Sequence, residues 1–315
     1  MNTLEERLQA REAFRDALLE AGAVSAGFAE AAPVDADVME QLKRWTSEGC
    51  HAGMDYLVRH IALKGNPETV LPGARTVISV AFSYFPEKWR DSDLPYIAAY
   101  AYGDDYHDVV RQRLTPVIER FRAEYGGDWR ICADSAPLAE RYWAMKTGIG
   151  RIGRNGCVII DGAGSFVFLA EILTTIAFPP DVESSRKCIG CGKCIRECPV
   201  GAIREDGTID SRRCLSYLTI EHRGEWDATG EEVMKTHNGR NTLYGCDRCL
   251  RVCPHNEDAG PSAIDEFRLR ESYSGLTGAY CRQMSQEEFS RLFRRSAIKR
   301  AKLSGLLRNA SNLEN

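Results

Sequence analysis

Cysteine spacing is the strongest constraint on this chain, because eight of its twelve cysteines lie between residues 188 and 253. Residues 188–199 read C-I-G-C-G-K-C-I-R-E-C-P, and residues 246–254 read C-D-R-C-L-R-V-C-P. The N-terminus lacks the uncharged apolar run of a signal peptide, and no stretch has the length of a membrane span. We therefore expect a cytoplasmic protein without a membrane partner. Clustered cysteines in a reducing compartment bind metal more often than they form disulfides.

The two cysteine runs have the spacing of bacterial iron–sulfur centres. In the C-x-x-C-x-x-C-x-x-x-C-P run, three cysteines hold one 4Fe–4S cluster and the fourth binds the neighbouring cluster. The second run lacks its first cysteine, and Cys214 is available to replace it. Two zinc ribbons would also use C-x-x-C pairs, but they do not explain a C-P ending that occurs twice. We predict two clusters, one held by Cys188, Cys191, Cys194 and Cys253, the other by Cys198, Cys214, Cys246 and Cys249.

The remaining cysteines are scattered, and we predict small buried hydrophobic side chains at Cys50, Cys132, Cys157 and Cys281. The chain has 41 basic and 45 acidic residues, a net charge of −4. That charge provides no global attraction for nucleic acid, so any such contact depends on a local patch.

The first 178 residues interleave predicted helices and strands, which indicates an α+β fold with a mixed sheet. Thr3 and Glu6 have capping-box spacing, and Gly22 ends the helix that they begin. We predict three regions: an α+β domain over 1–178, a ferredoxin-like two-cluster domain over 179–262 and a helical segment over 263–315. Other predicted elements are helices over 37–47, 106–125, 136–146 and 285–308, strands over 24–29, 76–85 and 129–132, and a hairpin joining 158–161 to 165–174.

Two motifs match known ligand signatures only in part. Residues 148–153 read G-I-G-R-I-G, but a dinucleotide site needs a strand before the glycines and a helix after them, and here the predicted order is reversed. Residues 105–107 begin like the D-x-H-x-x-G signature that supplies histidine to cobalt, but Val110 stands where the glycine should be. We therefore predict that His107 is a helix-surface histidine.

Asp134 has two interpretations. It could cap the helix predicted from residue 136, since aspartate is a favoured N-cap residue. It could instead be a buried acid whose raised pKa lets it donate a proton near neutral pH. A basic cluster near the C-terminus is either a solvated face or a phosphate-binding patch: Arg294, Arg295, Lys299, Arg300, Lys302 and Arg308.

Several motifs, in order along the chain, resemble the epoxyqueuosine reductase family. They are G-M-D-Y-L at 53–57 with R-H at 59–60, Y-G at 102–103 with D-Y-H at 105–107, D-S-A-P at 134–137 with the glycine loop, G-S at 164–165 with F-L at 168–169, R-C-L-S-Y-L-T-I-E at 213–221 and Y-G-C-D at 244–247. Each motif alone is weak, but the ordered set is specific.

The resemblance implies a cobalamin-dependent oxidoreductase with two 4Fe–4S clusters. Such an enzyme removes the epoxide oxygen of epoxyqueuosine at the wobble position of tRNA and gives queuosine, and Asp134 matches the family's proton donor. The family's N-terminal domain binds cobalamin without a histidine below the cobalt, which agrees with the failed D-x-H-x-x-G match. Motif matching gives these cobalamin contacts: Arg59, Tyr100, Asp134, Val158, Leu169, Ser216 and Asp247.

The resemblance also implies partners. One is a tRNA anticodon loop, because residues 296–300 and 307–310 resemble the family segment that leads toward tRNA contacts. The other is an electron donor such as a flavodoxin or ferredoxin system. We expect a monomeric short form, because many members continue into a helical-repeat domain and this chain ends at Asn315. Arg151 and Arg154 stand where the family usually has tryptophan and lysine, and His255 stands where it usually has tryptophan.

Those departures leave two other hypotheses. One is a cobalamin-handling or electron-transfer iron–sulfur protein without a tRNA substrate. The other is a ferredoxin domain fused to an unrelated enzyme, which would bind no corrinoid.

Overall fold

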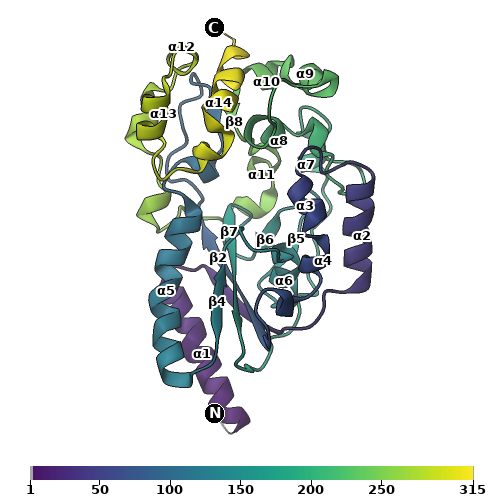
Figure 1. Cartoon of the computed structure of the whole chain (residues 1–315), viewed down its shortest axis with the longest axis vertical. Helices are drawn as coiled ribbons and strands as arrows, with labels where there is room; N and C mark the ends of the chain where they lie inside the picture. The colour runs from purple at the N-terminus through teal and green to yellow at the C-terminus, as the bar shows by residue number, and fades with distance from the viewer. Residues whose placement is uncertain (1–2, 315) are drawn as a thin grey trace.

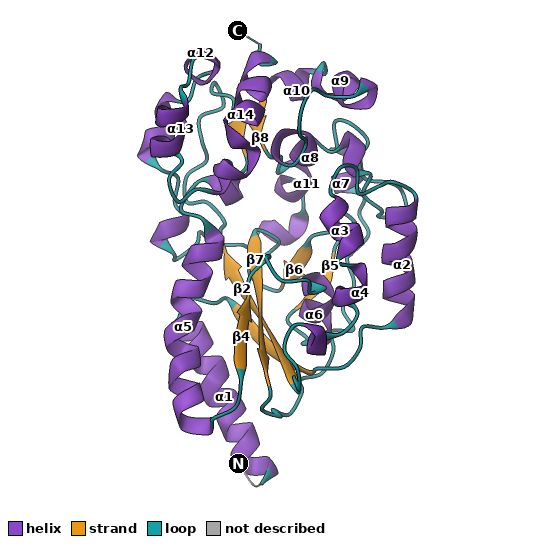
Figure 2. Cartoon of the chain, in the orientation of Figure 1, coloured by secondary structure: helices purple, strands orange, loops and turns teal. Residues whose placement is uncertain are grey.

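A four-stranded sheet forms the centre of the N-terminal part of the molecule (Figures 1 and 2). The computed structural model describes residues 3–314. The strand order is β1-β2-β7-β4, with β1 at Ser25–Glu30, β2 at Thr76–Ser83, β7 at Val167–Thr174 and β4 at Trp129–Cys132. The predicted combination of helices and strands is thus confirmed. The prediction of a sheet with both parallel and antiparallel strands is wrong for this four-stranded sheet. β7 lies between β2 and β4 and runs antiparallel to both, so every neighbouring pair is antiparallel.

Helices cover both faces of this sheet. α1 (Leu4–Glu20) and α5 (Tyr106–Tyr125) lie on one face, where Phe14 and Phe121 pack in the same apolar core as Val80 of β2. α6 (Glu140–Lys146) lies on the other face, where Trp143 packs near Val77. Side chains alternate between the two faces of a strand, so odd-numbered residues of β2 face α6.

Local signals predicted most of these elements correctly. The capping box of Thr3 and Glu6 is present, and Gly22 follows the helix at φ +100°. The predicted helix over 106–125 and the strand over 129–132 match α5 and β4. The glycine motif at 148–153 has a helix before it and a strand after it, as predicted: α6 precedes it and β6 (Val158–Ile160) follows, with the short strand β5 (Gly150–Ile152) inside the motif.

The predicted hairpin is wrong. β6 (Val158–Ile160) pairs with β5 in an antiparallel ribbon, and only an isolated bridge joins Ile160 to Gly164. β7 instead pairs along its whole length with β2 and, over residues 171–174, with β4.

The two predicted helices near residues 136 and 285 also differ from the structure. α6 begins at Glu140, because hydrogen bonds from Ser135 N–H to Ala133 O and from Leu138 N–H to Ala136 O close tight turns instead. The C-terminal helix is divided into α13 (Gln286–Leu292), a 3-10 segment η7 (Ala297–Ala301) and α14 (Lys302–Ser311). Arg295 and Lys302 have positive φ, which interrupts helical geometry at both junctions.

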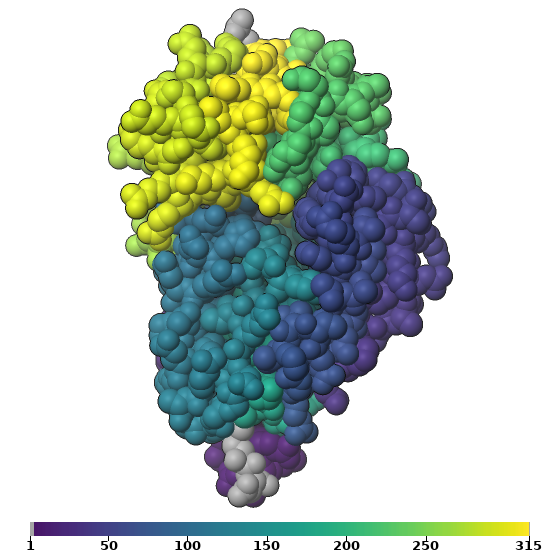
Figure 3. All heavy atoms as spheres, viewed as in Figure 1, coloured from purple at the N-terminus to yellow at the C-terminus, as the bar shows by residue number. Residues whose placement is uncertain are grey.

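The cysteine-rich segment and the C-terminus lie together above the sheet domain (Figure 3). Parallel pairing of β3 (Tyr96–Ile97) with β8 (Thr242–Tyr244) joins this part to the N-terminal region, and one apolar core contains residues of both. The other helices are α2 (Ala36–Ser47), α3 (Asp55–Arg59), α4 (Ile61–Lys64), α7 (Lys193–Arg196), α8 (Leu215–Ile220), α9 (Ala228–Met234), α10 (His237–Arg240), α11 (Arg248–Arg251) and α12 (Gly278–Arg282). Among residues 3–314, none of the helices has the length and apolar character needed to cross a bilayer.

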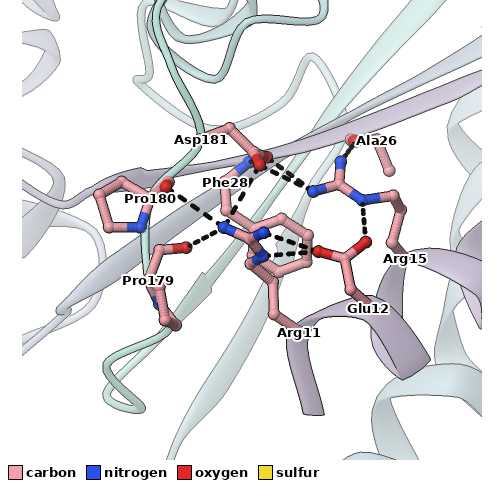
Figure 4. Close-up of polar contacts among 8 residues, drawn as sticks. All are labelled: Arg11, Glu12, Arg15, Ala26, Phe28, Pro179, Pro180 and Asp181. Carbon is pink, nitrogen blue, oxygen red and sulfur yellow. Dashed lines mark hydrogen bonds and ion pairs between the residues drawn. The ribbon is translucent and has the colours of Figure 1, made fainter. Parts of the chain in front are cut away.

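The segment that leads from β7 toward the first cysteine is tied to α1 (Figure 4). Asp181 accepts two hydrogen bonds from Arg15 Nη2, at 2.8 and 2.9 Å, and one from the backbone N–H of Phe28. Arg11 Nη1 donates to the carbonyls of Pro179 and Pro180. These contacts fix where the cysteine-rich segment leaves the sheet domain.

Candidate functional site

Asp134 lies in the turn between β4 and α6 and is held from two sides. Its φ of +55° falls in the left-handed region, which aspartate tolerates better than most residues. Tyr106 Oη donates to Asp134 Oδ2 at 2.5 Å, and the Asp134 N–H donates to Glu140 Oε1 at 2.8 Å. The side chain is 56% exposed, so its carboxylate is oriented yet open to a ligand. The N-cap interpretation is wrong, because Ala139 occupies the N-cap position of α6.

His107 belongs to the same site, which the prediction of a helix-surface histidine missed. Its Nδ1 lies 2.7 Å from Asp105 Oδ1, and its Nε2 lies 3.4 Å from Asp134 Oδ2. Burial opposes a charge on the ring, yet hydrogen bonds to the two carboxylates raise the pKa of His107 to about 9. The hydrogen bond to His107 in turn lowers the pKa of Asp134, so the expected upward shift by burial is wrong for this conformation.

Two further carboxyls lie behind Asp134, and neither was predicted. Glu171 on β7 is fully buried, opposite Ser79 of β2 and Cys132 of β4, and neither of its carboxyl oxygens has a hydrogen-bond partner among residues 3–314. Burial raises its pKa well above the ordinary value. Burial, with the nearby charge of Asp134, raises the pKa of Glu140 to about 7. The sequence signal was a lone acid inside the apolar strand F-L-A-E-I-L-T at 168–174.

Aromatic rings form one wall beside Asp134. The Tyr106 ring stacks on Phe168 with centroids 4.3 Å apart and planes within 3°, and the His107 ring stacks at 4.0 Å. Tyr100 lies edge-on to Tyr106 at 6.4 Å, and its hydroxyl is 3.0 Å from that of Tyr244. Phe168 lies between the rings of Tyr106 and Tyr84, so this stack supports the tyrosine that orients the Asp134 carboxylate.

Asp247 is a buried acid next to Tyr100. Its Oδ2 accepts from Ala99 N–H at 2.6 Å and from Tyr96 Oη at 2.9 Å, and the residue is 3% exposed. Burial raises the pKa of Asp247 to about 6, although both hydrogen bonds oppose that shift. Asp247, Tyr100, Tyr106 and Asp134 therefore form a continuous series of neighbouring residues.

The other predicted cobalamin contacts are more dispersed. Val158 and Leu169 pack in one apolar cluster under α6. Ser216 is half-buried on α8, just after Cys214. Arg59 is exposed at the end of α3 and has no hydrogen bond or ion pair from its side chain within the described residues.

The first predicted cysteine set lines one recess. Cys188, Cys191, Cys194 and Cys253 share it with Asn155 and His255, although Cys253 is distant in sequence from the other three. Cys191 is exposed and the others are half-buried.

The second predicted set lies deeper. Cys198, Cys214 and Cys246 pack against one apolar cluster around Leu215, and Cys249 packs against the main core. Burial raises the pKa of Cys246 to about 12, and the nearby Cys214 thiol adds to that shift. All twelve cysteines are free thiols, and within residues 3–314 no three metal-binding side chains converge on a single ion. Of the scattered cysteines, three are buried as predicted, whereas Cys157 is half-buried.

The predicted phosphate patch is smaller than expected. Arg300 pairs with Glu221 at 2.7 Å, and Arg308 donates to the carbonyls of Leu218 and Gly224. Arg295 pairs with Asp104 at 3.3 Å. These arginines hold the C-terminal segment in place. Within the described residues, three members have neither an ion pair nor a hydrogen bond from the side chain: Arg294, Lys299 and Lys302.

Comparison with protein families identifies two parts of the chain. A model described as a 4Fe-4S double cluster binding domain matches residues 187–256, and one described as epoxyqueuosine reductase QueG, DUF1730 matches residues 64–135. The epoxyqueuosine reductase of Cyclobacterium marinum is 34% identical, over 92% of this chain and 92% of its own. That of Vibrio cholerae is 35% identical, over 88% of this chain and 77% of its own.

Solved structures agree over nearly the whole fold. An epoxyqueuosine reductase bound to an epoxyqueuosine-modified tRNA-Tyr stem loop has a TM-score of 0.85 and 26% identity, covering 97% of this chain and 81% of its own. The Streptococcus thermophilus enzyme has a TM-score of 0.81 and 26% identity, covering 96% and 80%. The fold and the double-cluster segment define an iron–sulfur oxidoreductase. The chain belongs to the epoxyqueuosine reductase family, which confirms the resemblance found in the sequence.

Proposed function

We propose that this chain reduces epoxyqueuosine to queuosine at the wobble position of tRNA. The observation that carries the proposal is the oriented carboxyl of Asp134, beside an aromatic wall, in a chain of this family. An epoxide oxygen that leaves as carbon–oxygen bonds break needs a proton, and general acids supply it at hydrogen-bond distance. Asp134 is the donor in this proposal, and it must be protonated before it acts.

Cobalamin is the proposed cofactor, and the residues present fit it. Leu169 is half-buried and offers apolar surface in the same cluster as the buried Val158. The half-buried Tyr100 offers a hydroxyl, and the buried Asp247 holds the backbone just before this tyrosine through the Ala99 N–H. When bound, cobalamin supplies a cobalt centre that can be reduced to a strong nucleophile or electron donor. Both ring nitrogens of His107 face carboxylates, which supports a cobalamin held without a histidine ligand. Arg59, Ser216 and Asp134 complete the proposed contacts.

The eight clustered cysteines are the proposed ligands of two 4Fe–4S clusters in the interleaved sets given above. The shared recess of Cys253 with Cys188 supports the crossing of ligands between the two runs. We further propose the division into a cobalamin-binding region over 1–178, a ferredoxin-like region over 179–262 and a C-terminal segment over 263–315. The enzyme then acts as a cytoplasmic monomer.

Electrons enter at the first cluster in this proposal. Cys191 is exposed there, and Lys187, Lys193 and Arg196 are exposed close to it in sequence. A basic rim attracts an acidic partner and orients its approach. A flavodoxin or ferredoxin system has the chemistry required of that partner.

A tRNA anticodon loop is the proposed substrate partner. Its unpaired bases can be splayed out and stacked on aromatic rings. The half-buried rings of Tyr100 and Tyr106 beside Asp134 are the proposed aromatic contacts. Lys299, Lys302 and Arg294 remain to contact phosphates.

The test is anaerobic reconstitution followed by nucleoside analysis. The chain, loaded with iron, sulfide and cobalamin and given a reductant, should convert epoxyqueuosine in tRNA to queuosine, and it should contain about eight irons for two four-iron clusters. Full loading without product would overturn the tRNA substrate and favour a cobalamin-handling or electron-transfer role. An absence of cobalamin binding would overturn cobalamin as the cofactor. A ferredoxin domain fused to an unrelated enzyme is already excluded, because the family match extends over 92% of the chain.

A further inference from the structure

The proposed reaction needs more protons than Asp134 alone carries. Converting an epoxide to an alkene and water consumes two electrons and two protons. Asp134 can give one proton to the oxygen as the first carbon–oxygen bond breaks, and it is then a carboxylate. A second proton must reach that carboxylate, or the oxygen itself, before water leaves.

Glu140 is next to Asp134 on the protein side. Its Oε1 accepts a hydrogen bond from the backbone N–H of Asp134 at 2.8 Å, so the Glu140 carboxyl lies against the turn that carries Asp134. Tyr106 and His107 contact Asp134 from the opposite side, from α5. Glu140 thus belongs to α6 and approaches from the sheet side, while the exposed side of Asp134 stays free for the substrate.

Glu171 lies deeper, and its carboxyl has no other assignment in the fold. It is fully buried on β7, with neither oxygen hydrogen-bonded among residues 3–314, and Glu140 is its strongest charged neighbour. Leaving a buried carboxylate without partners is costly, so this group is retained as a neutral acid. The Ser79 hydroxyl faces Glu171 across the β2–β7 pairing and opposes the rise in its pKa. A neutral acid buried behind Glu140 is the feature that structural roles do not explain.

Burial is the largest effect on the Glu140 carboxyl and favours its neutral form, and the charge of Asp134 adds to that effect. The Asp134 N–H, Lys64 from α4 and Arg141 from α6 favour the charged form. The Lys64 amine donates to the carbonyl of Leu138 at 2.8 Å, and burial lowers its pKa. The balance leaves Glu140 with a pKa of about 7, so it can both hold and release a proton at neutral pH.

We propose that Glu140 returns a proton to Asp134 during each turnover, with Glu171 as a protonated reserve behind it. Asp134 first protonates the epoxide oxygen, Glu140 then transfers its carboxyl proton to the Asp134 carboxylate, and Asp134 protonates the oxygen again as it leaves as water. The clusters supply the two electrons. Glu140, now a carboxylate, regains its proton from Glu171 or solvent before the next cycle. This inference rests on the proposed function.

The test compares Glu140→Gln with the wild type and with Glu124→Gln, an exposed glutamate on α5. Glutamine keeps an oxygen that can accept the Asp134 N–H but cannot supply a carboxyl proton. We expect kcat to fall by at least about tenfold, with KM little changed. The loss should be smaller than the about 10²–10⁴-fold caused by removing a group that acts directly as acid or base, because solvent can also return the proton. The wild-type loss of kcat as pH rises through about 7 should disappear in Glu140→Gln.

Infrared titration of carboxyl groups gives a readout independent of activity. A carboxyl band should titrate near neutral pH in the wild type and be lost in Glu140→Gln but not in Glu124→Gln. Unchanged kcat and pH profile in Glu140→Gln, with an active wild type, would overturn this inference alone. A wild type that makes no product would overturn the proposed function, and proton return with it.

Discussion

Arg151 Nη2 lies 3.2 Å from His255 Nδ1, which brings together two positions at which the chain departs from the usual family residues. Arg151 also pairs with Asp161 at 2.5 Å and is 8% exposed. Because His255 lines the recess of Cys188 and Cys253, the pair supports the wall of the first proposed cluster site. The two departures therefore act as one structural change.

This contact predicts non-additive effects. Arg151→Ala and His255→Ala should each lower the melting temperature of the reconstituted protein. The double variant should lose less stability than the two single variants added together, because each single change already removes the shared contact. The difference should be a coupling free energy of about 0.5–3 kcal/mol. Calorimetric midpoints of the four proteins measure this. Additive losses would show that the contact carries no energy.

Asp134→Asn should lower kcat by about 10²–10⁴-fold, because asparagine can accept the Tyr106 hydrogen bond but cannot donate an acid proton. Iron content and cobalamin binding should be unchanged. Single-turnover assays with epoxyqueuosine-containing tRNA measure the effect. Activity near that of the wild type would exclude Asp134 as the proton donor.

His107 predicts a pH-dependent contribution to stability. Its pKa is raised in the folded state to about 9, so the folded protein binds the proton more tightly than the unfolded chain, whose ordinary value is 6.5. The stabilisation is fully present below about 6.5 and is lost as pH rises through about 9. Melting temperatures of the wild type and His107→Gln should therefore converge over that window. A constant difference would contradict the paired, charged state.

Glu171 also makes stability fall as pH rises, because ionisation of this buried carboxyl is penalised in the folded state. Its raised pKa means that the folded protein keeps a proton that the unfolded chain releases, so stability falls as pH rises above the ordinary glutamate value of 4.5. Glu171→Gln removes this burden while keeping a neutral side chain. The variant should melt higher than the wild type at neutral and alkaline pH, and the gain should shrink in acid. Equal melting curves at all pH values would argue against a buried neutral acid.

Cys253→Ser tests the crossing of cluster ligands. It should remove about four of about eight irons, since each cluster holds four. The EPR signal of the cluster that remains should have the same integrated intensity as in Cys246→Ser. Its line shape should differ, because the two variants lose different clusters. Cys281→Ser, a change at a buried cysteine in the main core, should keep full iron content. Full iron content in Cys253→Ser would overturn its assignment.

The sequence alone determined features that depend on short-range chemistry. The capping box of Thr3 and Glu6 set the start of α1, and the cysteine spacing and ordered motifs identified the family and its double-cluster segment. These signals need only residues that are close together along the chain.

Tertiary structure decided the rest, because distant segments had to meet. β7 lies between β2 and β4 and runs antiparallel to both, while β6, its predicted partner, pairs with β5. The same arrangement buries Glu171 opposite Ser79, and the late start of α6 brings Glu140 to the Asp134 turn. The pKa of Asp134 is lowered because α5 brings His107 beside it, a contact that spacing along the chain does not encode.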